Sequence, residues 1–301
     1  MKEMISLVGH QCIDGFTSIA CYLNAVEMNG YEILFVKSSR MRRVNPKYNS
    51  VVFDMDWRFI KNVKVIMCYD HHASTPPRPP YIIRPSSPST VNIIASHLPV
   101  DINPILLHVI NALDSGNKVG KNFVKEKYKL AKLSKAIQMA EPRKLHDLVE
   151  LASQNLHLDP LEYGNLLIRK GLKEEFNFIL ERDRRTKGVI EKVLENVKEN
   201  QRILVSIYGE EPWKFIDASW LASSIGRKTR RLVCVWLQEN KQIVLRGHGA
   251  VNIAQALGGG GHDFAAGAID VNLTRVKSIV KPEREISIII KTRYWGEIIA
   301  E

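Results

Sequence analysis

The stretch VKVIMCYDHH, residues 63–72, decides the fold prediction, because an apolar run typical of a buried strand ends here in three polar residues. Two other apolar runs end in a similar way. MISLVG at residues 4–9 is followed by His10, and SVVF at residues 50–53 is followed by Asp54. Polar side chains at the ends of buried strands are typical of the ligand-binding edge of a parallel sheet.

The segments around these runs also favour a parallel sheet. Residues 16–28 carry apolar side chains at helical spacing, and YEILFV at residues 31–36 has the composition of a strand. Strands that alternate with helices predict βα units, so we expect an α/β fold with an N-terminal, Rossmann-like parallel sheet. Strand patterns return at residues 203–207, 232–237 and 243–245, which predicts a smaller C-terminal α/β domain.

A charged, helical stretch without Gly or Pro between residues 172 and 188 separates the two strand-rich parts of the chain. We therefore expect an N-terminal domain over residues 1–180, a linking helix over residues 181–200 and a C-terminal domain over residues 201–301. A cleft between two such domains is a common place for a ligand.

Composition narrows the class of protein. The chain has 301 residues, with 43 Lys and Arg against 32 Asp and Glu, and its formal charge of +11 favours polyanionic partners such as nucleic acid or an anionic membrane. Four scattered cysteines exclude a disulfide framework and predict a reducing, cytoplasmic setting. The N-terminus lacks a signal-peptide pattern, and the apolar stretch at residues 91–113 is too polar to span a membrane, so we expect no membrane partner.

Seven polar residues follow predicted strands or end a predicted helix, and the carboxyl ends of parallel strands meet at one edge. They are His10, Asp14, Asp54, Asp70, His71, His72 and Asp114. Carboxylates gathered in one crevice repel one another unless a cation lies among them. Such oxygen-rich ligands with imidazoles suit Mn(II) or Mg(II), with Zn(II) and Fe(II) as alternatives. Two ions of this kind can promote the attack of water on a phosphodiester.

A second cluster, LGGGGHDFAAG at residues 257–267, contains four successive glycines. Glycines let the backbone approach an anion closely, and we expect their N–H groups to turn toward a phosphate. The small residues after the glycines predict the start of a helix, whose N-terminus would add to anion binding. His262 and Arg246 are then candidate donors to a phosphate or a nucleobase. Arg227, Lys228, Arg230 and Arg231 fit either a nucleic-acid track or a solvated helix face.

With DHH at residues 70–72 and GGGGHDFAAG at residues 258–267, the sequence resembles the DHH phosphoesterases with the DHH-associated C-terminal domain. That family includes RecJ-like exonucleases, nanoRNases and cyclic-dinucleotide phosphodiesterases, and the resemblance covers nearly the whole chain. It implies a metal-dependent hydrolase of short single-stranded RNA or DNA, an oligoribonuclease or exonuclease. It also implies two divalent ions, in the first place Mn(II), with Mg(II), Co(II) and Zn(II) as alternatives.

The resemblance assigns the metal ligands residue by residue. Asp54 would bridge the two ions, and His10 would bind one of them. The ligands of the other ion would be Asp14, His71 and Asp114. Asp70 would orient these ligands.

The resemblance also assigns substrate contacts. His72 would face the substrate phosphate, and Arg246 would contact substrate from the C-terminal domain. The remaining contacts would come from Gly259, Gly260, Gly261 and His262. The catalytic residues are thus Asp54, Asp70 and His72.

Cys12 departs from the family pattern, which reads H-x-D-x-D-G where this sequence has HQCIDG at residues 10–15. A thiolate there favours a softer ion such as Zn(II), whereas a neutral thiol leaves one metal position short of a ligand. Cys12 as a small buried loop residue is a third reading. Activity would be weakened, changed in metal preference or lost.

Two alternatives remain at this point. An enzyme of the same fold could hydrolyse a smaller substrate, such as a cyclic dinucleotide, a linear dinucleotide or phosphoadenosine phosphate. A catalytically weakened relative could instead act as a replication-complex subunit that binds GINS and the helicase; Cys12 motivates this reading and the retained ligands argue against it. A homodimer is also left open.

Overall fold

The computed structural model describes residues 4–37, 44–72, 75–117, 119–290 and 298–299. The chain divides into two compact units, Met1–Ile179 and Leu180–Glu301. Among the residues described, no helix is both long and apolar enough to cross a membrane.

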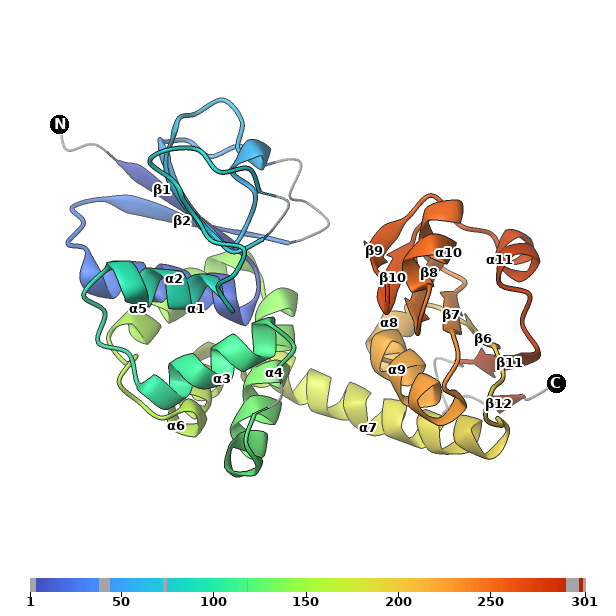
Figure 1. Cartoon of the computed structure of the whole chain (residues 1–301). Helices are drawn as coiled ribbons and strands as arrows, with labels where there is room; N and C mark the ends of the chain where they lie inside the picture. Colours follow the sequence, from blue (N-terminus) through green and yellow to red (C-terminus); the bar gives the residue numbers. More distant parts are fainter. Residues whose placement is uncertain (1–3, 38–43, 73–74, 118, 291–297, 300–301) are drawn as a thin grey trace. The chain divides into compact units, whose positions relative to one another are not determined.

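The first unit contains a five-stranded parallel sheet in the order β2-β1-β3-β4-β5, as Figure 1 shows in part. Its strands are β1 (Ile5–His10), β2 (Tyr31–Val36), β3 (Ser50–Phe53), β4 (Val65–Asp70) and β5 (Ile82–Ile83). The four longer strands lie where the apolar runs predict them, and β5 is a short strand at the edge of the sheet. The predicted α/β class and its parallel sheet are confirmed.

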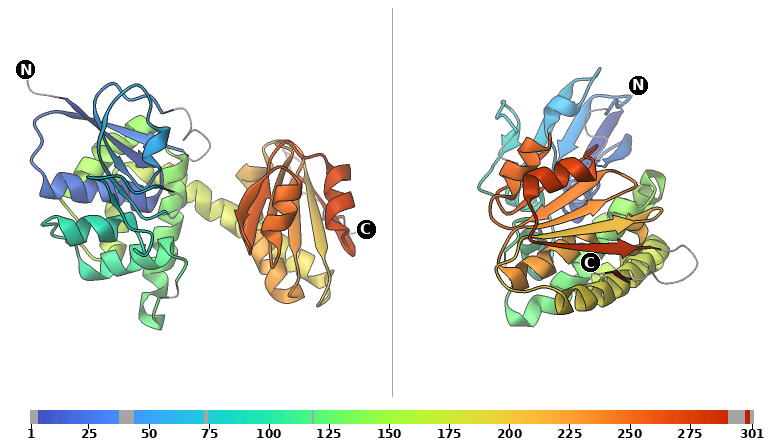
Figure 2. Two further views of the ribbon diagram at one scale, coloured as in Figure 1. Left: turned by 45° about the horizontal axis from the view of Figure 1, so that its top comes forward. Right: turned by 90° about the vertical axis from the view of Figure 1, so that its right-hand side faces the viewer.

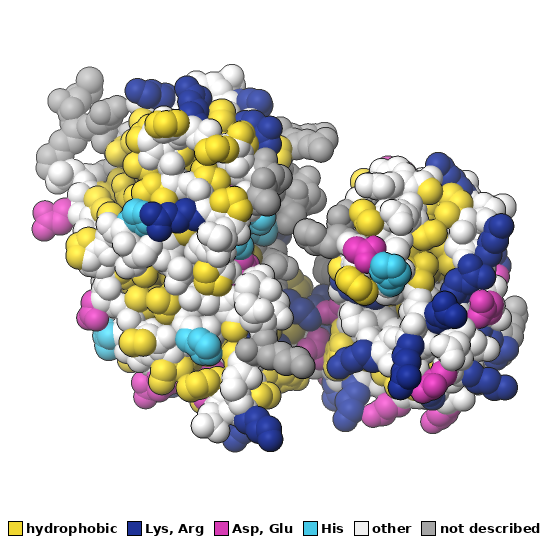
Figure 3. Space-filling model, viewed as in Figure 1, with side chains coloured by type: hydrophobic (Ala, Val, Ile, Leu, Met, Phe, Trp, Pro, Cys, Tyr) yellow, Lys and Arg dark blue, Asp and Glu magenta, His cyan; other side chains and the backbone are white. Residues whose placement is uncertain are grey.

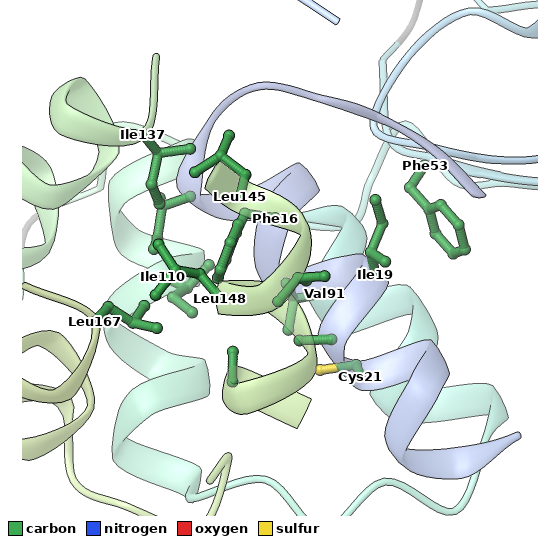
Figure 4. Packing of buried hydrophobic residues seen from close by; sticks show 14 of the residues in the cluster. Phe16, Ile19, Cys21, Phe53, Val91, Ile110, Ile137, Leu145, Leu148 and Leu167 are labelled. Carbon is green, nitrogen blue, oxygen red and sulfur yellow. The ribbon is translucent and has the colours of Figure 1, made fainter. Parts of the chain in front are cut away.

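Helices cover one face of this sheet. They are α1 (Ile13–Ala25), α2 (Thr90–His97), α3 (Pro104–Asp114), α4 (Val124–Met139), α5 (Pro142–Ser153) and α6 (Pro160–Leu167). Figure 4 shows the core beneath them, where Phe16 of α1 packs with Ile110 of α3 and Leu148 of α5. The opposite face buries Val8 and Cys68 against irregular segments around the short helix η2 (Trp57–Phe59). The short helices η3 (Lys121–Phe123) and η4 (Ile168–Leu172) precede α4 and α7.

Helix α7, Lys173–Glu195, runs across the division between the units, and its Ile190 and Val193 belong to the core of the second unit. The second unit has a seven-stranded mixed sheet in the order β12-β11-β6-β7-β8-β10-β9. Its strands are β6 (Ile203–Tyr208), β7 (Val233–Leu237), β8 (Gln242–Arg246), β9 (Gly260–His262), β10 (Ala265–Ala268), β11 (Arg284–Ile289) and β12 (Ile298–Ile299). Its shorter helices are α8 (Pro212–Phe215), α9 (Ala218–Thr229), α10 (Ala250–Ala256) and α11 (Leu273–Val280).

Both faces of the second sheet are buried, and helices lie on both sides of it (Figure 2). Val205 and Val233 pack on the side of α9, while Leu204 and Cys234 pack on the side of α10 and α11. Neighbouring residues of one strand thus point to opposite cores, as the period of two along a strand requires. This alternation explains the continuous apolar runs in the sequence of β6 and β7.

The helix predicted after the glycine cluster is wrong. The chain forms β9 and β10 there, and β10 pairs antiparallel with β8, with Ala265 opposite Arg246. The small residues serve close pairing of strands instead of a helix start. The nearby helix α10 comes before the glycines, so its C-terminal end and not its N-terminal end meets them.

Candidate metal centre and basic pocket

Three adjacent strands of the first sheet carry three of the predicted metal ligands, His10, Asp54 and His71, at their carboxyl ends. Strands β1, β3 and β4 are neighbours, and Gly9 pairs with Phe53, which pairs with Tyr69. The residues just beyond these positions are therefore side by side. Indeed the N–H of Asp54 donates a hydrogen bond to the carbonyl oxygen of Tyr69 at 3.0 Å.

The structure brings the predicted ligands into two groups that share Asp54, and His72 joins Asp54 and His71 in a third. The ligand atoms of the first group lie within 4.8 Å of one another and belong to Asp14, Asp54, His71 and Asp114. Its central atom is Nε2 of His71, which is 2.7 Å from Oδ2 of Asp114 and 3.4 Å from Oδ1 of Asp54. The second group consists of His10, Cys12 and Asp54. One carboxylate between two donor groups is the arrangement that two neighbouring cations need.

Asp54 itself is buried and has an unusual backbone conformation. Its side chain is 2% exposed, and its φ of 57° lies in the left-handed region. A residue other than glycine pays on the order of 1 kcal/mol for that conformation, and such strain gathers at functional sites. The conformation lets Oδ2 face His10, with 3.4 Å to its Nδ1, while Oδ1 faces His71.

The first turn of α1 holds Asp14 in place. A Cβ atom on Gly15 would lie 2.2 Å from the carbonyl oxygen of His10, so only glycine lets this turn pack against the end of β1. Asp14 is fully buried, and its two oxygens accept hydrogen bonds from the N–H groups of Thr90 and Val91 at 2.8 and 3.0 Å. The start of α2 thereby orients this carboxylate.

The charges of the first group shift the pKa of its members. Burial raises the pKa of Asp14 well above its usual range, and the carboxylates of Asp54 and Asp114 raise it further. Burial acts on Asp54 in the same direction, but His10 and His71 outweigh it and hold the pKa of Asp54 below its usual range. Burial lowers the pKa of His71, yet Asp114 and Asp54 raise it to about 11. These oxygen and imidazole donors therefore fit a divalent cation.

Asp70 lies beside the two groups and organises the DHH segment. It is fully buried, and its Oδ1 accepts hydrogen bonds from the N–H groups of His71 at 2.9 Å and His72 at 3.3 Å. The Nδ1 atom of His72 lies 2.7 Å from the same oxygen, and the hydroxyl of Thr75 donates to Oδ2. The His72 side chain is 47% exposed, so Asp70 fixes one edge of an imidazole that solvent and ligands can reach. This hydrogen bond raises the pKa of His72.

Cys12 begins α1 as its N-cap residue. Its Sγ accepts a hydrogen bond from the N–H of Gly15 at 3.2 Å and lies 3.0 Å from Oδ2 of Asp54. Burial raises the pKa of the Cys12 thiol, and the carboxylates of Asp54 and Asp14 act in the same direction.

Sequence reasoning missed two residues that support this centre. The side-chain amide of Gln11 donates to the carbonyl oxygens of Ile137 and Ala140 at 2.7 and 2.8 Å, which ties the loop between His10 and Cys12 to the end of α4. The hydroxyl of Thr90 donates to Oδ1 of Asp54 at 3.3 Å. Of these two residues, only Thr90 could be placed from the sequence: Ser89 is a good N-cap before an apolar segment, which predicts that a helix begins at Thr90.

The second unit contains a basic pocket of about 800 Å³. It is lined by Arg246 of β8, by Arg227, Arg230 and Arg231 at the end of α9 and beyond it, and by Phe264, among others. Figure 3 shows Lys and Arg side chains gathered over the part of this unit where α9 lies. These arginines from α9, β8 and the segment after α9 thus line one pocket.

Two side chains of this pocket differ in how they are held. The guanidinium of Arg246 donates to the hydroxyl of Ser219 and to the carbonyl oxygen of Leu245, and burial lowers its pKa. The Phe264 side chain has 65% of its surface exposed, and its ring lies 5.6 Å from that of His248. The pocket thus combines the fixed guanidinium of Arg246 with an exposed aromatic face.

The glycine cluster does not form the expected row of N–H groups. The N–H of Gly258 donates to the carbonyl oxygen of Gln255, and that of Gly259 donates to Ala254, because both glycines close the end of α10. A Cβ atom on Gly259 would lie 2.1 Å from the carbonyl oxygen of Gly267, so close pairing explains this glycine. Gly260 and Gly261 belong to β9, and the side chain of His262 lies outside the described part of the structure.

The comparisons with known proteins found matches by structure but none by sequence. The sequence matches no family model and no curated protein. In contrast, RecJ from Thermus thermophilus in complex with Mn²⁺ matches 96% of this chain with a TM-score of 0.57 and 17% identity, and the chain spans 54% of that protein. The pGpG-specific phosphodiesterase PggH from Vibrio cholerae matches with a TM-score of 0.62 and 13% identity, over 93% of this chain and 97% of PggH.

A third structure, an exonuclease RecJ bound to manganese, matches with a TM-score of 0.54 and 16% identity, over 93% of this chain and 90% of that one. The sequence identities are low, so what these three proteins share with the chain is its fold. RecJ exonucleases and phosphodiesterases are the classes of protein to which the DHH and GGGGH motifs point. The chain therefore has the fold of the DHH, RecJ-like phosphoesterases, in agreement with its motifs.

Proposed function

We propose that the protein is a metal-dependent phosphodiesterase of the DHH family that hydrolyses short single-stranded RNA or DNA. The observation that carries the proposal is the position of Asp54, whose carboxylate is shared by two groups of ligand atoms at the end of a parallel sheet. The motifs and the fold support the same activity.

Two divalent ions would occupy these groups, with Mn(II) the first candidate and Mg(II), Co(II) and Zn(II) as alternatives. Asp14, His71 and Asp114 would hold one ion, His10 the other, and Asp54 would bind both. When bound, such ions supply Lewis acidity for the attack of water and charge for the developing phosphorane oxygens. The protein contributes the spacing of the donors, which the ends of β1, β3 and β4 hold together with α1 and α3.

His72 has the geometry of a substrate contact. Asp70 accepts from the N–H of His72 and lies 2.7 Å from its Nδ1, which leaves Nε2 of the half-exposed ring to meet a phosphate oxygen. Because this pairing also raises the pKa of His72, the ring carries positive charge over a wider pH range than an isolated imidazole.

The basic pocket of the second unit would bind the neighbouring nucleotides. Arg246, Arg230 and Arg231 line it and can neutralise phosphates, while the exposed ring of Phe264 offers a face on which a base can stack. Cations together with an exposed aromatic ring are the combination that single-stranded nucleic acid requires. This pocket supports single-stranded oligonucleotides as partners.

The test is hydrolysis of labelled RNA and DNA oligonucleotides of graded length with Mn(II), with wild type compared to Asp54→Asn. The amide keeps the size of the side chain but removes the charge that two cations share. We expect wild type to release mononucleotides and Asp54→Asn to lose at least roughly 100-fold in rate, since bridging carboxylates act on both ions. Equal rates in the two proteins would rule out the proposed site.

The same length series distinguishes this activity from a second candidate function, the hydrolysis of dinucleotides. PggH, a protein of nearly the same span, is named for pGpG, and this favours a short substrate. A rate that peaks at two nucleotides and falls with each added residue would identify a dinucleotide phosphodiesterase. A rate that holds or rises with length would identify an exonuclease.

A further inference from the structure

We propose that the two metal positions are chemically different, and that the one formed by His10, Cys12 and Asp54 takes a thiolate-binding ion such as Zn(II) through the Cys12 sulfur. The other position, with only carboxylates and an imidazole, takes a harder ion such as Mn(II) or Mg(II). The inference rests on the proposed function for the presence of bound metal, but it does not depend on hydrolysis.

The first support is the environment of Cys12. All four cysteines are buried, but Cys21, Cys68 and Cys234 each belong to an apolar cluster and Cys12 belongs to none. Its sulfur instead meets polar partners, the N–H of Gly15 at 3.2 Å and Oδ2 of Asp54 at 3.0 Å. A cysteine that only filled space would face side chains like those around Cys21. The structure thus favours Cys12 as a ligand over Cys12 as a packing residue.

The second support is the spacing of the donors. Oδ2 of Asp54 lies 3.0 Å from Sγ of Cys12 and 3.4 Å from Nδ1 of His10, and all three atoms lie within 4.8 Å of one another. Zinc binds sulfur at about 2.3 Å and nitrogen or oxygen at about 2.0–2.2 Å, so its tetrahedral ligand atoms stand roughly 3.3–3.6 Å apart. The separation of Asp54 and His10 already fits this spacing, and the Cys12 sulfur would move about half an ångström away from Asp54 to share one ion.

Sulfur chemistry then separates the two positions. When the ion binds, the S–H bond of Cys12 breaks, a sulfur–metal bond forms and the proton passes to solvent, with no change in oxidation state. Thiolate ligands select Zn(II) and Co(II) over Mn(II) and Mg(II), which prefer carboxylate and water oxygens. The first group offers three carboxylates and His71 but no sulfur. One chain would thus hold two different ions.

The test measures metal content and spectra of the full-length protein without substrate. Metal-stripped protein is incubated with one equivalent of Zn(II) per chain and an excess of Mn(II), desalted and assayed for both elements, and a second sample is titrated with Co(II). We expect about one Zn(II) per chain and a near-ultraviolet charge-transfer band, which a Co(II)–thiolate bond produces and oxygen ligands do not.

Three variants make the spectral result specific. Cys12→Ser should remove the band, and Cys12→Asp should remove it and also raise the bound Mn(II) relative to Zn(II). Cys234→Ala is the matched control, since it removes a buried thiol in the core of the second unit, outside both donor groups, and should keep the band; circular dichroism checks that each variant folds. A wild-type protein that binds Co(II) without the band, or a band that persists in Cys12→Ser, overturns the inference.

The outcomes also separate this inference from the proposed function. A protein that shows the band but hydrolyses no oligonucleotide retains the inference and loses the proposed activity. An active protein without the band loses the inference alone. A protein that binds none of these ions loses both.

Discussion

Nε2 of His71 lies 2.7 Å from Oδ2 of Asp114, which joins the end of β4 to the last residue of α3. The two residues are far apart in the sequence. Helix α3 ends at Asp114, and the carboxylate of Asp114 reaches the carboxyl end of β4. Because the Asp114 side chain is 26% exposed while Asp14 and Asp54 are buried, Asp114 forms the solvent-facing side of its donor group.

Replacement of Asp114 by Asn should therefore weaken one metal position without unfolding the protein. The side chain is partly exposed, so the amide has little burial cost, but it lacks the charge that attracts a cation. We expect the affinity for Mn(II) at that position to fall about 10- to 100-fold, the size of effect seen when support of a metal site is lost. Isothermal titration with Mn(II) measures it, and an unchanged affinity would remove Asp114 from the ligands.

The metal-free protein should lose stability as the pH rises. The pKa of His71 is raised from 6.5 to about 11 in the folded chain, so its contribution to stability is complete below pH 6.5 and disappears as the pH rises toward 11. The raised pKa of Asp14 acts in the same direction, because folding must then bury a carboxylate that is charged when unfolded. Between about pH 6.5 and 9, the Tm in EDTA should fall.

Mn(II) should reverse this trend, because protons compete with the cation for the same ligands. The rise in Tm on adding Mn(II) should be larger at about pH 9 than at about pH 6.5, and His71→Asn should flatten the fall of Tm with pH in EDTA. Thermal unfolding followed by circular dichroism gives all of these values. A Tm in EDTA that rises over the same pH range would contradict the assignment of charge within the centre.

The part of the centre that could be predicted follows from the sheet. Once β1, β3 and β4 are recognised as parallel strands, His10, Asp54 and Asp70 must follow strand ends at one edge, and the order of the sheet makes those strands neighbours. The left-handed conformation of Asp54 could not be predicted, since aspartate adopts it only where the surroundings compensate for its strain. The sheet explains why these residues meet, while packing decides how they face one another.

The second unit was harder to predict because its local signals compete with long-range pairing. Gly258 to Ala268 carries the small residues of a phosphate-binding turn, yet Ala265 lies opposite Arg246 in a ladder that no local pattern specifies. The pocket depends in the same way on the approach of the end of α9 to the loop after β8. Arg230 and Arg231 could be identified as pocket residues only after this packing was known.

Arg231 provides a direct test of that pocket. Its side chain is exposed, lines the pocket and has no ion-pair partner in the described part of the chain, so its charge is available to a phosphate. In the inactive Asp54→Asn background, Arg231→Gln should weaken binding of a labelled single-stranded oligonucleotide to the same degree for every sequence. It should also reduce the dependence of log affinity on log salt by roughly 0.7, the value for one phosphate contact on a single strand.

Lys192→Gln is the matched control, because Lys192 is an exposed cation of α7 outside the pocket. It removes the same formal charge, so a general attraction between a +11 protein and a polyanion would weaken equally in both variants. Fluorescence anisotropy over a series of salt concentrations distinguishes the two cases. If Lys192→Gln lowered the affinity and the salt dependence as much as Arg231→Gln, the arginines of the pocket would be a solvated surface and not a binding site.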